Sequence, residues 1–141
     1  MKALATALLA VLALGACGGG SDDGLDMKVR LVVEDKNIRV EGAECAGARP
    51  LEYAHAEAGY AIEDGTGKVL ADGELPAGHA VNADPSIDWG VERIPTFCVF
   101  DLEVDGVPRR AGYRLKLDRG SPLPFPASLV EGGKPVTVSL R

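Results

Sequence analysis

Residues 96–117, which read TFCVFDLEVDGVPRRAGYRLKL, carry the clearest indication of fold in this chain. Apolar and polar residues alternate on both sides of Asp105-Gly106, a pattern typical of strands with one apolar face. Asp-Gly is favoured in two-residue type I′ turns, because both central positions of that turn need positive φ. We therefore predict a β-hairpin with Asp105-Gly106 as its turn.

This turn would also fix which residues of the hairpin lie opposite each other. The expected pairs are Val104 with Val107, Phe100 with Ala111, Cys98 with Tyr113 and Asp101 with Arg110. In this register the apolar faces of both strands coincide, as a sheet that covers a core requires. We expect the hairpin to form the centre of a β-sandwich.

The composition is that of a single domain rich in strands and turns. The chain has 141 residues, 46% of them hydrophobic, which suffices for one domain with a substantial core. Its 18 glycines and 9 prolines favour short strands and turns over long helices. The formal net charge of −6 disfavours nucleic acid as a partner, because phosphate contacts need a clustered basic face.

Two more hairpins are expected before the central one. Residues 28–34 and 38–40 alternate between apolar and polar, which predicts two strands joined at Asp35-Lys36-Asn37. Residues 59–64 and 68–75 predict another pair of strands around the glycine-rich turn at 65–67.

The remaining segments complete the expected architecture. A last strand should point Val136, Val138 and Leu140 inward, and one helical turn is expected around residues 127–131. Residues 79–95 form the longest segment without a regular pattern. We predict an all-β, two-sheet immunoglobulin-like or transthyretin-like sandwich of seven or eight strands over residues 28–141.

The N-terminus has the features of a targeting segment. Lys2 precedes an apolar run of about twelve residues, shorter than the ~20 residues needed to cross a bilayer. The run ends in Leu14-Gly15-Ala16-Cys17, which resembles the lipobox of bacterial lipoproteins. The resemblance implies a signal peptide over residues 1–16 and a diacylglyceryl group on the sulfur of Cys17.

The lipid would set where the protein is located. Residues 17–27 would then be the lipidated cysteine and a flexible linker, and the lipid would hold the domain outside the cytoplasm. The lipid would anchor the protein to the outer face of the cytoplasmic membrane, or to the outer membrane if the host has one. The alternative is an ordinary secretory peptide, which Leu14 fits less well because such cleavage sites need small residues.

The two other cysteines are expected to form a disulfide. If Cys17 carries lipid, Cys45 and Cys98 remain as an even pair in an oxidising compartment. Closing a loop of about 53 residues would stabilise the fold by roughly 4 kcal/mol in the chain-entropy model. The alternative, a redox or metal-binding pair, lacks the C-x-x-C spacing that brings two thiols together locally.

A second resemblance covers most of the mature chain. It rests on Cys45, the Asp64-Gly65-Thr66-Gly67 turn, Cys98-Val99-Phe100, Val107-Pro108, Tyr113, Arg119-Gly120 and the closing Val136-Thr137-Val138-Ser139-Leu140. This series is similar to small secreted or lipid-anchored β-proteins of actinobacteria, a group with no established activity. The resemblance implies the sandwich and the disulfide, and it transfers no catalytic residue.

No motif in the sequence predicts a catalytic, metal or cofactor site. His55 and His79 have no partner at the spacing of a preformed zinc motif, and residues 84–88 lack the twelve-residue pattern of a calcium loop. No G-x-S-x-G motif surrounds the serines that could act as nucleophiles, which are Ser86, Ser121, Ser128 and Ser139. We therefore predict no catalytic residue, no metal and no cofactor.

Two regions are candidates for contact with a ligand. In the long loop, Trp89 with Asp84 and Asp88 would offer a stacking platform or a partner contact, although a core plug at the sandwich mouth is the favoured reading of Trp89. The second region is an outward basic face made of Arg110, Arg114 and Lys116. It would meet an anionic headgroup or polymer, but we favour a solvated face neutralised by Asp101, Glu103 and Asp118.

The resulting functional hypothesis is a non-enzymatic binding module of the cell envelope. Its partners would be the membrane, through the lipid, and an envelope protein or glycan. One alternative is a metal- or carboxylate-dependent envelope hydrolase, and another is a purely structural envelope component.

Overall fold

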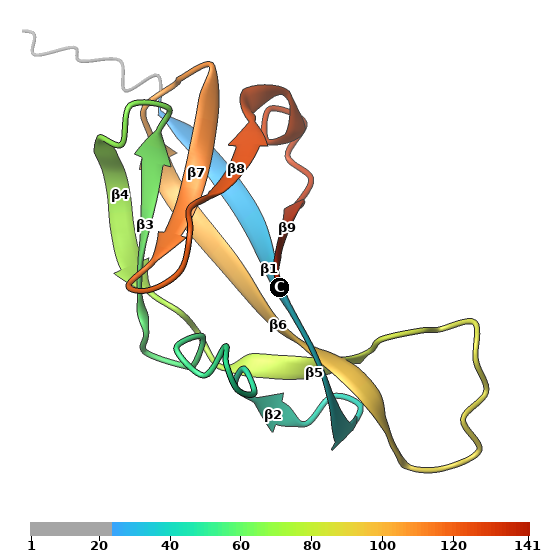
Figure 1. Cartoon of the computed structure of the whole chain (residues 1–141). Helices are drawn as coiled ribbons and strands as arrows, with labels where there is room; N and C mark the ends of the chain where they lie inside the picture. The colour runs from blue at the N-terminus through green and yellow to red at the C-terminus, as the bar shows by residue number, and fades with distance from the viewer. Residues whose placement is uncertain (1–23) are drawn as a thin grey trace, which may run out of the picture.

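The computed structural model describes residues 24–141, which form nine strands and one short 3₁₀ helix (Figure 1). The strands are β1 (Leu25–Val40), β2 (Glu44–Cys45), β3 (Gly59–Asp64), β4 (Val69–Glu74), β5 (Gly78–Asn82), β6 (Arg93–Val107), β7 (Gly112–Leu117), β8 (Leu123–Pro126) and β9 (Val136–Leu140). The helical turn η1 (Ala127–Leu129) lies where one was expected. The predicted signal peptide and the lipidation site at Cys17 lie outside the described residues.

The strands form two sheets. One has the order β2-β5-β6-β1-β9 and the other β4-β3-β7-β8. All neighbours are antiparallel except β9, which runs parallel to β1. The all-β, two-sheet architecture is confirmed, with nine strands where seven or eight were expected.

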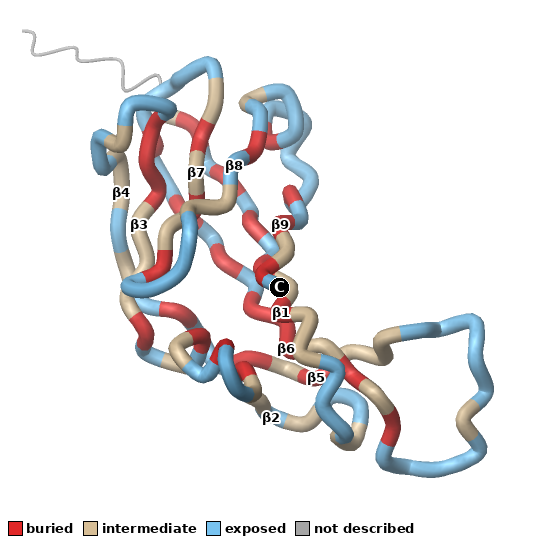
Figure 2. The backbone as a smooth tube through the Cα atoms, viewed as in Figure 1, coloured by how far each residue is buried: buried red, intermediate tan, exposed pale blue. Residues whose placement is uncertain are grey.

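The hydrophobic core lies between the two sheets and is built by both (Figure 2). Leu31 and Phe100 contribute from the five-stranded sheet, and Ile62 and Leu115 from the four-stranded one. All four side chains are fully buried. Residues 25–33 of β1, 100–104 of β6 and 112–117 of β7 alternate buried and more exposed residues, as expected when one face of a sheet is covered.

The predicted central hairpin is wrong, because β6 and β7 belong to different sheets. β6 pairs with β1 and β5, whereas β7 pairs with β3 and β8. None of the four pairs expected across the Asp105-Gly106 turn forms a strand pair; Asp101, for example, lies opposite Arg30. The apolar faces of β6 and β7 do not lie side by side but contribute to the same core from opposite sheets.

Asp105-Gly106 forms an irregularity within β6 rather than a turn. The pairing of β1 with β6 shifts between Leu25 and Met27, and Gly106 has a φ of 65° and donates its backbone N–H to Asp26 Oδ1 at 2.9 Å. A glycine at positive φ suits a β-bulge as well as a type I′ turn, so the dipeptide alone does not distinguish the two. The chain crosses between sheets just beyond, where Tyr113 Oη accepts the Arg110 N–H at 2.9 Å.

The first predicted hairpin is also wrong, and the second is confirmed. Residues 28–40 belong to one strand, β1, whose register shifts between Val33 and Asn37, with Lys36 at a φ of 50°. β1 also begins at Leu25, three residues before the expected start, because buried Leu25 and Met27 continue the alternation. β3 and β4 form the second hairpin, and β9 buries Val136, Val138 and Leu140 as expected.

The predicted disulfide is confirmed. Cys45 and Cys98 are bonded, with their Cα atoms 5.8 Å apart, and they connect β2 to β6. Gly78 on β5 lies against this bond: a Cβ there would come within 2.8 Å of Cys98 Sγ and 2.7 Å of the Cys45 carbonyl oxygen. A side chain at position 78 would therefore displace the disulfide or the backbone of β2.

Candidate functional site

The β1–β6 pair extends beyond the sandwich. In Figure 1 the lower part of this ribbon, with β5 and β2 beside it, continues past the end of the four-stranded sheet. We call residues 35–40 of β1 and 93–97 of β6 the distal half, and residues 25–33 of β1 and 98–107 of β6 the sandwich half. The four-stranded sheet therefore does not cover the inner face of the distal half, which must be stabilised by other contacts.

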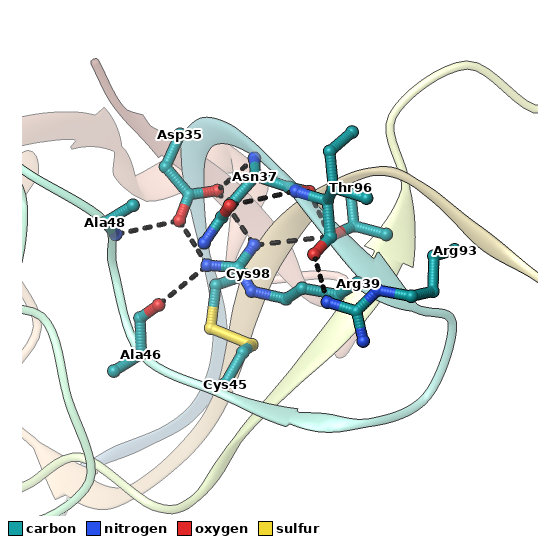
Figure 3. Close-up of polar contacts among 10 residues, drawn as sticks. Asp35, Asn37, Arg39, Cys45, Ala46, Ala48, Arg93, Thr96 and Cys98 are labelled. Atoms are coloured by element: carbon teal, nitrogen blue, oxygen red, sulfur yellow. Dashed lines mark hydrogen bonds and ion pairs between the residues drawn. A yellow bond between two sulfur atoms is a disulfide. The ribbon is translucent and has the colours of Figure 1, made fainter.

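A buried ion pair occupies the inner face of the distal half (Figure 3). The Asp35 side chain is 1% exposed and that of Arg39 is 11% exposed. Arg39 makes a bidentate pair with Asp35, with Nη1 at 3.1 Å from Oδ1 and Nη2 at 2.5 Å from Oδ2. Arg39 Nη1 also donates to Thr96 Oγ1 at 3.2 Å, and that hydroxyl donates to the Asn37 carbonyl at 2.9 Å. The pair therefore joins β1 to β6.

The same pair holds the chain that follows β2. Arg39 Nη2 donates to the Ala46 carbonyl at 2.8 Å, and the Ala48 N–H donates to Asp35 Oδ2 at 2.9 Å. Burial raises the pKa of Asp35, but hydrogen bonds from Arg39 and Ala48 outweigh it and leave the pKa below its usual value. With the disulfide beside them, these contacts make the distal half a cross-linked platform.

A ten-residue loop projects from this platform (Figure 1). We call residues 83–92, which join β5 to β6, the Trp89 loop. It is shorter than the expected irregular segment 79–95, because β5 and the start of β6 take up the ends of that segment. The backbone N–H groups of Ser86 and Gly90 donate to Asp84 and Asp88, at 3.1 Å in both cases. The two aspartates therefore shape local turns.

The carboxylate of Asp84 is held in its charged form by these turns. Ser86 Oγ donates to Asp84 Oδ1 at 2.5 Å, and this bond, followed by the Ser86 N–H, lowers the pKa of Asp84. Asp84 and Asp88 are both exposed, as is Glu92. The loop thus presents negative charge around its apolar residues.

The apolar residues of the Trp89 loop lie at the surface rather than in the core. Ile87 is 42% exposed and Val91 is 64% exposed, and Trp89 is half-buried. The Trp89 indole N–H donates to Asn82 Oδ1 at 3.3 Å, which fixes the ring against the end of β5. A shallow hollow of about 450 Å³ is lined by Asn82, Ile87, Asp88, Trp89, Gly90, Val91, Glu92 and Ile94.

The expectation that Trp89 plugs the core is therefore wrong. Trp89 does not belong to the buried cluster between the sheets, because its loop leaves the distal half where no second sheet covers it. The geometry of Trp89 fits a surface contact rather than a core plug.

Arg114 and Lys116 lie on β7 of the other sheet, Arg110 lies in the connection before β7, and two of the three basic residues are paired with carboxylates. Arg114 Nη2 lies 2.8 Å from Glu63 Oε2, and Arg110 Nε lies 3.6 Å from Asp64 Oδ2. The expected partners were wrong, since Asp101 pairs with Arg30 and Glu103 with Lys28. Lys116 has no ion pair within the described part of the chain. The structure therefore does not bring Arg110, Arg114 and Lys116 together with Trp89.

Sequence reasoning missed an apolar strip on the outer face of the distal half. Ile38 lies opposite Pro95, and Val81 lies opposite Phe97, on the face turned away from the four-stranded sheet. Ile38 is 48% exposed and the other three are half-buried. The signal was present in residues 94–100, IPTFCVF, because a strand that is apolar on both faces does not alternate.

No group of three side chains that could hold a metal ion occurs among residues 24–141. His55 contacts the neighbouring Ala56 carbonyl through Nδ1, and His79 Nε2 lies 3.7 Å from Asp101. Within the same residues, the helical structure does not reach the length or hydropathy of a membrane span.

Comparisons with protein-family models, with curated proteins and with solved structures returned no match to this chain.

Proposed function

We propose that this protein is a lipid-anchored, extracytoplasmic binding module of the cell envelope that contacts a partner protein through the Trp89 loop. The observation that supports this most is the exposure of Ile87 and Val91 beside Trp89 on a loop that projects from a braced platform. Apolar side chains at the tip of a projecting loop lose water contact only when another surface covers them.

The composition of the loop resembles a small protein-binding patch. Interfaces commonly place an aromatic residue and aliphatic side chains at the centre, with a polar or charged rim that sets partner choice. Here Ile87, Trp89 and Val91 supply the centre, and the exposed carboxylates of Asp84, Asp88 and Glu92 supply the rim. An acidic rim favours a partner with basic residues around an apolar pocket.

A protein partner fits this surface better than a glycan. Sugars need several hydrogen-bonding side chains around the stacking ring. Here Asp84 Oδ1 and Asp88 Oδ1 accept bonds from their own loop, and the indole N–H of Trp89 is bonded to Asn82. The exposed groups of the loop are then the apolar side chains of Ile87 and Val91 and the rim carboxylates.

The partner can be identified by placing a photo-crosslinking amino acid at Val91 in living host cells. Leu129, which is 52% exposed on η1, serves as a matched apolar control site. We expect one discrete protein adduct from Val91 and none of the same mass from Leu129, and an added Ile87→Asp substitution should remove it. Adducts of glycan, equal adducts from both sites, or none from Val91 would contradict the proposal.

The anchor has its own test. A Cys17→Ser variant should incorporate no labelled fatty acid, whereas the parent chain should. If the variant still incorporates labelled fatty acid, the lipid anchor at Cys17 is wrong. The proposed contact through the Trp89 loop is tested separately by the crosslinking experiment.

A further inference from the structure

The free edge of the four-stranded sheet is β4. Of the four edge strands among residues 24–141, β2 has two residues, β9 lies beside β8, and β8 carries Pro124 and Pro126. Proline has no N–H to donate, and it blunts an edge against further pairing. β4 has six residues and no proline, and no other strand of the described residues lies beyond it (Figure 1). Its outer backbone groups are therefore available for pairing.

The outer face beside this edge is hollow and acidic. A hollow of about 630 Å³ is lined by Gly59, Tyr60, Ala61, Glu63, Asp72, Gly73, Glu74, Lys116, Leu117 and Asp118. Asp72 lies opposite Ala61 and Glu74 opposite Gly59, so their cross-strand neighbours are too small to cover them. The hollow therefore exists because β3 carries small residues at these two positions.

The carboxylates of β4 form no ion pair in the described part of the chain, although Lys116 lines the same hollow. Asp72 and Glu74 are exposed and stand two residues apart on one face. Glu63 differs, because Arg114 binds it. Burial and, after it, the charge of Asp72 raise the pKa of Tyr60, whose ring packs on the core side of β3.

We propose that the β4 edge binds an extended basic peptide segment by strand addition. The peptide backbone pairs with β4, and its alternate side chains, lysine or arginine, lie against Asp72 and Glu74. Main-chain hydrogen bonds supply affinity in this mode of recognition, and alternate side chains supply specificity. Long basic side chains can cross β4 and rest their alkyl stems over Ala61, because the Asp118 carboxylate already lies against Gly59.

A basic segment fits the edge better than a second copy of this chain. Antiparallel pairing of β4 with itself, centred on Asp72 or on Gly73, sets carboxylate opposite carboxylate, and like charges in that position are destabilising. The chain also has a net charge of −6, which opposes self-association. The proposal is independent of the Trp89 loop, which projects from the other sheet.

The test uses the peptide Lys-Thr-Lys-Thr-Lys-Thr, capped at both ends, and amide chemical shifts of the isotope-labelled domain. The same peptide with glutamate for lysine tests charge, and a version N-methylated at alternate residues tests backbone pairing. We expect the basic peptide to shift the amides of β4, and the two other peptides to bind at least about tenfold more weakly.

Matched variants separate the edge from general charge attraction. Asp72→Lys with Glu74→Lys should weaken binding at least about tenfold, whereas Glu41→Lys with Glu131→Lys, two exposed sites away from β4, should leave it within about twofold. Equal losses in both pairs, shifts confined to residues 83–92, or undiminished binding of the N-methylated peptide would overturn the proposal. Concentration-dependent dimerisation through β4 that excludes the peptide would assign the edge to a second copy instead.

Discussion

The sandwich half and the distal half of the β1–β6 ribbon differ in what covers their inner face. In the sandwich half, Leu31 and Phe100 face the apolar side chains of the other sheet. In the distal half, the corresponding face carries Asp35, Arg39 and Thr96, covered by backbone groups of residues 46–48. The same two strands are thus stabilised by hydrophobic burial at one end and by a polar network with a disulfide at the other.

This difference explains how a small sandwich can present a loop away from its core. A second sheet over the distal half would also cover the base of the Trp89 loop. Charge-assisted hydrogen bonds and a disulfide brace two strands without adding a layer. The distal half can therefore be rigid and still leave its outer strip and its loop at the surface.

Truncating the core of the sandwich half should be the most damaging change. Phe100 is fully buried, so Phe100→Ala should lower the free energy of unfolding by about 4 kcal/mol through lost burial and a cavity. Urea unfolding, monitored by far-UV circular dichroism, measures this change in the free energy of unfolding. A loss below about 1 kcal/mol would mean that the core is not centred on this residue.

Removing the disulfide should cost less and act first on the distal half. Cys45→Ala with Cys98→Ala should lower the free energy of unfolding by about 3 kcal/mol, less than the ~4 kcal/mol of the chain-entropy model for a cross-link spanning 53 residues, because unfolded chains retain some structure. Trp89 fluorescence should report loosening of the loop at lower urea than circular dichroism reports unfolding of the sheets. Coincident transitions with an unchanged midpoint would contradict this expectation.

Breaking the buried ion pair should have a smaller effect. Arg39→Met leaves the charged Asp35 side chain buried without its cation, and the free energy of unfolding should fall by about 2 kcal/mol. This is less than the ~3–5 kcal/mol typical of breaking a fully buried ion pair, because Asp35 still accepts a hydrogen bond from the Ala48 N–H. Asp35→Leu with Arg39→Met removes both charges and should regain part of the loss. A double variant less stable than Arg39→Met would show that the two residues do not act as a pair.

Acid should weaken the distal half through Asp35. Its pKa in the folded protein lies below the usual value of 3.8, so its contribution is present above pH 3.8 and lost as the pH falls through the folded-state pKa. Between about pH 5 and 2, the parent should lose more stability than the Asp35→Leu, Arg39→Met variant. The other carboxylates titrate alike in both proteins. Parallel curves of unfolding free energy against pH would therefore exclude Asp35 as a source of the acid sensitivity.

Prediction from sequence succeeded where one signal had one structural meaning. The alternation in β9 and the glycine-rich turn between β3 and β4 were read correctly, because both depend on local chemistry. The disulfide followed from counting cysteines. Asp105-Gly106 does not identify its own structure, because a bulge and a turn need the same positive φ, and only the pairing of β6 with β1, some 80 residues away, decides between them.

The site was predictable only in part. Trp89, Asp84 and Asp88 were singled out because they stand in an irregular, apolar-bearing segment, and the structure does place them on one projecting loop. The sequence does not predict the platform, because its pattern places Asp35 in a turn and Arg39 in a strand, and nothing in their spacing indicates that they are buried. The partners of Arg110 and Arg114 were missed because β3 lies about 50 residues earlier.

Native-state hydrogen exchange of the Arg39→Met variant addresses whether the distal half is a separately braced platform. The distal amides, such as those of Ile94 and Thr96, should exchange much faster than in the parent, while those of Phe100 and Leu102 should lose only the protection that the drop in global stability requires. Equal loss of protection in both halves would contradict the account, because the polar network would then be one more part of a single cooperative core.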